Sequence, residues 1–187
     1  MGFKSKQVIN NFRKYFRWGS FSLNTLLVTG VFLLHSSCSV NYSFTGASIS
    51  PKVKTVTIQY FPNQASLVVP TLSRALTDAL RDYFTSQTNL VLVDKGGDLN
   101  IEGTITGYVV QPIAIQGNET AAMNRLTITV NVIFTNKTDE KQNFETNFSR
   151  YEDYQSTLNL SSVQDGLIKQ INDKLVQDVF NKAVVNW

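Results

Sequence analysis

The side chains that could form covalent bonds or transfer protons near neutral pH are few in this chain of 187 residues. It contains one cysteine, Cys38, and one histidine, His35. A single cysteine excludes an intramolecular disulfide and any multi-cysteine zinc site. Residues 39–187 contain neither a thiol nor an imidazole for nucleophilic catalysis, zinc binding or proton transfer. We therefore expect no catalytic residue, no metal and no cofactor.

Carboxylates are the other groups that could perform acid–base chemistry. A hydrolase that uses carboxylates alone would combine Glu102 with Glu119, Glu145 or Glu152, and no spacing in the sequence pairs them. The pair Gly96-Gly97 does not belong to a phosphate-binding loop, because no GxxxxGK[ST] pattern is present. The chemistry of the chain therefore points back to Cys38 and its flanks.

Residues 1–37 have the composition of a secretory leader. They carry five basic and no acidic residues, and they contain the uncharged apolar run LNTLLVTGVFLL at 23–34. A run of a dozen residues is shorter than the ~20 of a membrane-spanning helix, so the pattern predicts a cleaved signal. Without this leader the chain has 12 basic and 14 acidic residues. The overall charge of +3 therefore gives no reason to expect nucleic-acid binding.

The residues before Cys38 resemble the lipobox of bacterial lipoproteins. Ser36-Ser37-Cys38 matches its last three positions, and His35 stands where leucine is usual. The resemblance implies that Cys38 becomes the first residue of the mature protein and carries a thioether to diacylglycerol. An ordinary secretory signal that happens to contain a cysteine is the alternative. We expect a leader at 1–37, a lipidated tether at 38–52 and one folded domain at 53–187.

The apolar pattern of the folded domain predicts five strands and two helices. Two amphipathic helices follow from apolar spacings of three and four, one starting at Pro70 or Thr71 and the other running from Ser161 to Trp187 with Ser161 or Ser162 as its cap. Alternating or continuous apolar runs predict strands at 53–60, 90–93, 99–115, 125–136 and 142–155.

The order of these elements, β-α-β-β-β-β-α, predicts an α+β two-layer sandwich. One mostly antiparallel sheet would be covered on one face by the two helices. We expect Tyr60 on the buried face of the first strand, a hairpin turn at 94–98, and close approach of a helix at Gly103 and Gly107. The uncovered face would carry mainly Thr, Asn and Ser. It is either a solvated face or a face that sits in a wet cavity or against a partner.

Residues 38–187 resemble the LptE-like lipopolysaccharide-assembly lipoproteins of the Bacteroidota. The resemblance is carried by four stretches, which are the start VNYSFTGASI at 40–49, VKTVTI at 53–58, LSRAL at 72–76 and the end FNKAVVNW at 180–187. It implies a non-enzymatic, lipid-anchored protein of the outer membrane that faces the periplasm. Its partners would be an LptD-type β-barrel, in which it sits as a plug, and lipopolysaccharide (LPS).

Two points stay open beside this resemblance. A periplasm-facing lipoprotein adaptor or ligand-binding module without a barrel partner is the alternative function. The family is thought to bind LPS phosphates through basic residues, and the candidates in this sequence are Arg125, Lys137, Lys141 and Arg150. The alternative, which the near-neutral charge of the domain favours, is that the same four residues are isolated surface charges.

Overall fold

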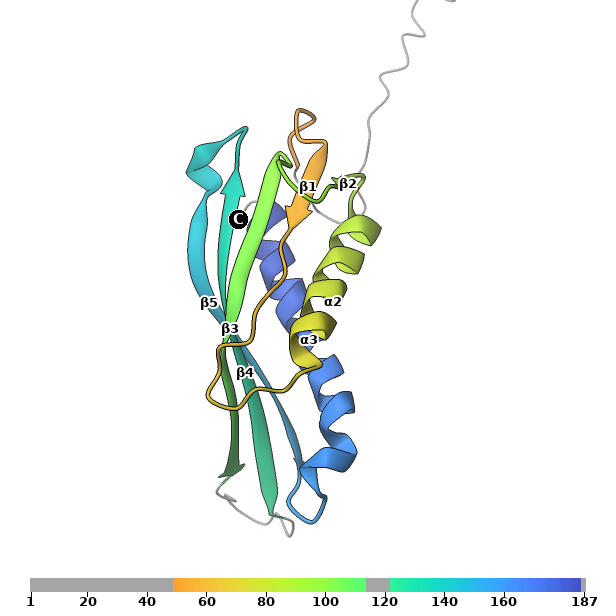
Figure 1. The fold of residues 1–187 in the computed structure, drawn as a ribbon, viewed down its shortest axis with the longest axis vertical. Coiled ribbons are helices and arrows are strands. Elements are labelled where there is room, and N and C mark those ends of the chain that lie inside the picture. The colour runs from red at the N-terminus through yellow and green to blue at the C-terminus, as the bar shows by residue number, and fades with distance from the viewer. Residues whose placement is uncertain (1–48, 114–121, 186–187) are drawn as a thin grey trace, which may run out of the picture. The chain divides into compact units, whose positions relative to one another are not determined.

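The computed structural model describes residues 49–113 and 122–185. The predictions about the leader, Cys38, His35 and Glu119 lie outside these residues. Figure 1 shows one sheet with both helices on the same side of it. The elements in chain order are β1 (Thr55–Ile58), α2 (Leu72–Gln87), β2 (Val91–Leu92), β3 (Leu99–Ile113), β4 (Met123–Asn136), a short 3-10 turn (Glu140–Gln142), β5 (Phe144–Gln155) and α3 (Leu160–Val184).

The predicted α+β two-layer class and element order are confirmed. The five strands lie in the order β2-β1-β3-β4-β5. The three long strands β3, β4 and β5 pair antiparallel over most of their length, and these pairings dominate the sheet. The short strand β1 pairs in parallel with both β2 and β3.

The predicted hairpin at 94–98 is wrong, because β2 and β3 are not neighbours. The chain leaves β1, passes through α2 and returns as β2, a connection long enough to make β2 parallel to β1. It then crosses to the other side of β1, where Leu99 begins β3 opposite Val56. Gly97 makes this crossing possible, because a Cβ there would lie 2.8 Å from the Thr57 backbone nitrogen.

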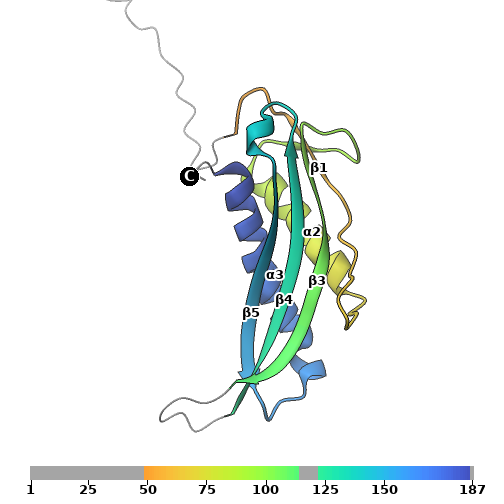
Figure 2. The same cartoon turned by 90° about the vertical axis from the view of Figure 1, so that its left-hand side faces the viewer.

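The hydrophobic core lies between the sheet and the helices. Figure 2 shows the uncovered face of the long strands toward the viewer, with α2 and α3 behind it. Burial of apolar area on this one side is the main stabilising contribution to the fold. The largest fully buried side chains are Phe61, Phe84, Phe134, Leu72, Leu76, Leu80, Ile101, Ile105, Leu126, Ile128, Ile171 and Leu175.

A β-bulge in β3 changes which residues face the core. The register with β4 shifts between Ile105 and Gly107. Beyond the bulge Tyr108 is buried, with 3% of its surface exposed, whereas Val109 is 49% exposed. The alternation of the sequence predicts the reverse, with Val109 facing the core and Tyr108 facing outward. The bulge causes the difference, because one extra residue in a strand moves every later side chain to the other face.

Gly103 allows close approach of strand β4 and of the Phe61 side chain, and not of a helix. A Cβ at Gly103 would collide with the backbone oxygen of Asn131 in β4 and lie 2.7 Å from the Phe61 ring. At Gly107 it would lie 3.2 Å from Thr129 Cβ, again in β4. The predicted close approach therefore exists at Gly103, but the prediction that a helix makes it is wrong.

Two element ends also differ from the prediction. Strand β1 ends at Ile58, so Tyr60 is 57% exposed, and Phe61 turns into the core with its N–H donating to Thr77 Oγ1 over 3.1 Å. Helix α3 is capped by Asn159, whose side chain accepts from the Ser161 N–H, instead of by a serine. Among the described residues, neither helix is long and apolar enough to cross a membrane.

Candidate interaction surfaces

The uncovered face of the sheet, called the open face below, is made of the outward residues of β3, β4 and β5. Its centre is a set of cross-strand hydrogen bonds between β4 and β5. The Thr129 and Ser149 hydroxyls lie 3.0 Å apart, and Asn131 donates to Asn147 over 3.1 Å. Because these uncharged groups satisfy one another across the strands, the face loses little when water is removed from it.

One basic candidate, Arg125, lies on the open face close to Met123, where β4 begins. Its guanidinium donates to both Asp153 oxygens over 2.7 and 2.9 Å and lies 3.6 Å from the centre of the Tyr151 ring. The hydrogen bonds from Arg125 lower the pKa of Asp153, and the same bonds raise the pKa of Arg125. Arg125 is therefore neutralised within the chain, and a phosphate would have to compete with Asp153 for it.

A second candidate, Arg150, belongs to the helix side of the molecule. It donates to both oxygens of Asp178 in α3 over 2.5 and 2.7 Å, and hydrogen bonding to Asp178 raises its pKa. Lys174 of α3 also pairs with Glu152 of β5. These two ion pairs connect β5 to α3, so the charge of Arg150 has a structural role.

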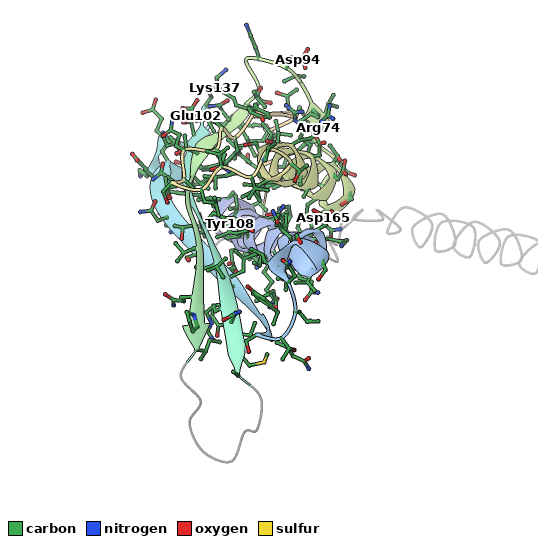
Figure 3. All side chains as sticks on the ribbon, turned by 60° about the horizontal axis from the view of Figure 1, so that its bottom comes forward. Arg74, Asp94, Glu102, Tyr108, Lys137 and Asp165 are labelled. Atoms are coloured by element: carbon green, nitrogen blue, oxygen red, sulfur yellow. The ribbon has the colours of Figure 1, made fainter. Side chains whose placement is uncertain are left out.

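The remaining candidates, Lys137 and Lys141, lie at the end of the sheet where β3 begins. Lys137 Nζ donates to the Gly96 carbonyl over 2.8 Å, and Figure 3 labels Lys137 at this end. Lys141 is exposed in the 3-10 turn. The four candidates therefore occupy three separate places, and the structure brings only the two lysines to the same end.

The candidate carboxylates are also dispersed. Glu102 and Glu145 both lie on the open face, but Ile133 of β4 stands between them in the strand register. Glu102 accepts from Gln59 over 2.8 Å, whereas Glu152 lies on the helix side with Lys174. Within residues 49–113 and 122–185, no three metal-ligating side chains gather in one place.

Asp98 is a structurally important residue that the sequence assigned only to a turn. Its Oδ2 accepts from the backbone N–H groups of Lys54 and Thr55 over 2.8 and 3.0 Å, and from Thr55 Oγ1 over 3.0 Å. These hydrogen bonds lower the pKa of the Asp98 carboxyl. They join the crossing between β2 and β3 to the start of β1. Thr55 and Asp98 are 43 positions apart in the chain, which explains why no local motif revealed the contact.

The fold defines the class of protein, which is a small two-layer α+β domain. Residues 53–183 match the family model LptE, described as Lipopolysaccharide-assembly, so the chain belongs to this family. The predicted LptE family is confirmed, and its Bacteroidota type stays a prediction. The match spans every described helix and strand of the domain up to the last turn of α3.

Solved structures of low sequence identity resemble the chain in part. The minor lipoprotein from Acinetobacter baumannii is 16% identical, covers 66% of this chain and 91% of its own, and has a TM-score of 0.43. The rare lipoprotein B from Shewanella oneidensis is 14% identical, with coverages of 68% and 92% and a TM-score of 0.41. No curated protein matches the sequence significantly.

Proposed function

We propose that this protein is a non-enzymatic lipoprotein subunit of the outer-membrane LPS translocon. It is anchored to the membrane by lipid on Cys38, faces the periplasm and sits as a plug in an LptD-type β-barrel, where it assists barrel assembly and the insertion of LPS into the outer leaflet. The observation that carries this proposal is the LptE family match over nearly the whole folded domain.

The open face supports a position against a partner. Its central hydrogen bonds are already made between Thr129, Ser149, Asn131 and Asn147, so a second surface can cover these uncharged side chains at little cost. The exposed Tyr151 beside it has the character of an interface residue, because aromatic and arginine side chains are enriched at protein contacts.

Depletion of the protein combined with affinity purification tests this function. We expect surface LPS to fall on depletion and a large β-barrel to co-purify with the tagged protein after mild detergent extraction. An adaptor without a barrel would be recovered alone, and its depletion would leave surface LPS unchanged. That result would reject the proposed function.

A charge placed on the open face tests its role in this complex. Thr129→Glu should leave the protein folded but reduce the amount of barrel recovered, because a buried carboxylate without a partner is costly. Thr85→Glu adds the same charge at an exposed position of α2 and is the matched control. Equal recovery of the barrel with both variants would show that the open face faces solvent.

The lipid anchor is tested separately. Cys38→Ala should abolish labelling by radioactive palmitate, because only the cysteine sulfur forms the thioether. The soluble variant should keep the thermal melting temperature of the delipidated domain. Persistent labelling would show that Cys38 is not the acylated residue.

A further inference from the structure

The two helices separate along part of their length and leave a groove on the outer side of the helix layer. They are held together near their C-terminal ends, where the Phe180 ring lies 5.1 Å from the Tyr83 ring and 5.0 Å from the Phe84 ring. Toward its N-terminus, the α2 side of the groove is lined by Thr71, Ala75, Asp78 and Ala79. A groove of about 790 Å³ results.

The floor of this groove is apolar and its rim is acidic. Ala75, Ala79, Ile168 and Val176 contribute the apolar lining. The ionic side chains that line it are the carboxylates Asp78, Asp82, Asp165 and Asp173 and the ammonium group of Lys169. Figure 3 labels Asp165 on α3.

Part of this negative charge has no partner among the described residues. Asp173 pairs with Lys169 over 2.8 Å, and Asp78 lies 3.9 Å from Arg81. No cation among the described residues lies within ion-pair distance of Asp82 or Asp165. The rim therefore presents two uncompensated carboxylates, one from each helix.

A buried amide supplies a second, independent feature. Asn172 of α3 lines the groove with only 2% of its surface exposed, and its Oδ1 has no hydrogen-bond partner among the described residues. An unpaired acceptor in a buried position is costly and calls for a donor. The amide calls for a hydrogen-bond donor and the rim for a positive charge, and a cationic donor supplies both.

We propose that this groove is the docking site for a basic polypeptide segment of a protein partner. Basic side chains of that segment would lay their aliphatic stems on the apolar lining and bring one cationic head to Asp82 and another to Asp165. The acidic rim repels LPS phosphates and anionic lipids, so it selects against both. This inference goes beyond the proposed function, because the partner need not be the barrel.

Site-specific photocrosslinking in the full-length protein in cells identifies the occupant. A photoreactive amino acid is placed at Ala75 or at Ser86, which are exposed positions that line opposite ends of the groove. Gln170 is an exposed position of α3 outside the groove lining and is the control site. We expect both groove positions, but not Gln170, to crosslink to a peptide rich in Lys and Arg, identified by mass spectrometry.

The charge requirement is tested in the same experiment. Combining Asp82→Asn with Asp165→Asn should lower the adduct yield on the order of tenfold. Glu140→Gln with Asp94→Asn removes the same charge at exposed positions away from the groove and the open face, and should leave the yield unchanged. Adducts at neither groove position, adducts with lipid or with acidic or neutral peptides, or a yield insensitive to the two aspartates would each overturn the proposal.

The outcomes separate this proposal from the proposed function. Barrel co-purification without a basic adduct in the groove would reject the groove assignment and keep the translocon function. A basic adduct from another protein, without barrel co-purification, would reject the translocon function and support the groove assignment.

Discussion

The two faces of β4 show how one strand serves two purposes. Its helix-facing residues Leu126, Ile128 and Val130 are at most 1% exposed and form the centre of the core. Its outward residues alternate with them, are half-buried and are mostly uncharged and polar, as at Thr127 and Thr129. The stability of the domain thus depends mainly on one face, which leaves the other face free to evolve for contact with a partner.

The largest expected difference is between neighbouring residues of β4. Ile128→Ala should lower the free energy of unfolding by about 2–5 kcal/mol, because it leaves a cavity in the core. Thr129→Ala, on the opposite face, should lower it by only about 0.2–1 kcal/mol, because it loses the cross-strand hydrogen bond to Ser149. Urea unfolding of the purified variants measures both. Similar losses for the two variants would contradict the division between a stabilising and a permissive face.

Two glycines extend the comparison to backbone packing. Gly103→Ala should destabilise by about 1–3 kcal/mol, because its methyl group would meet the Asn131 backbone and the Phe61 ring. Gly166→Ala in α3 has nothing within 4 Å of the new Cβ and should stabilise by about 0.5–1 kcal/mol. Thermal denaturation gives the direction of each change. A stable Gly103→Ala protein would show that β3 and β4 can move apart there.

Asp98 should make stability depend on pH. Its folded-state pKa is lowered below the usual 3.8 by the bonds from Lys54 and Thr55, so its stabilising contribution is present at neutral pH and is lost as the pH falls through the lowered pKa. The urea midpoint of the wild-type protein should exceed that of Asp98→Asn at pH 7, and the two should converge in acid. Asp94→Asn, in the same loop, is the control. A constant difference across pH would exclude this linkage.

The ion pair between Arg150 and Asp178 should have the smallest effect. Its side chains are 49% and 25% exposed, so solvent screens the attraction. A double-mutant cycle with Arg150→Met and Asp178→Asn should give a coupling of about 0.2–1 kcal/mol that decreases with added salt. A coupling unaffected by salt would show that the contact between β5 and α3 is better shielded than its exposure indicates.

Most of the fold could be predicted because periodicity reports burial directly. The alternation of β4 identified all five of its core residues from Leu126 to Phe134. The bulge near Thr106 could not be predicted, because the alternation of residue types continues through it. The sheet order was also inaccessible, since a Gly-Gly turn looks the same whether it closes a hairpin or crosses a neighbouring strand.

The candidate surfaces were harder to predict than the core. The sequence identified the polar face and the basic residues, but not that Arg125 and Arg150 each face an aspartate 28 residues away. It also assigned Asp78 and Asp82 to one helix without showing that Asp165 and Asp173 line the same groove. Such pairings depend on how elements pack, and no local spacing encodes them.

The position of β1 has a consequence for the order in which the domain forms. This four-residue strand lies between β2 and β3, so its two sets of partners are synthesised about 30 to 45 residues after it. The hairpins of β3, β4 and β5 need only local contacts and can close by themselves. Strand β1 is synthesised first, but it gains both neighbours only after the segment from β2 to β3 has crossed it and Asp98 has bonded to Lys54 and Thr55. Until then its edges stay open to a chaperone or to another extended chain.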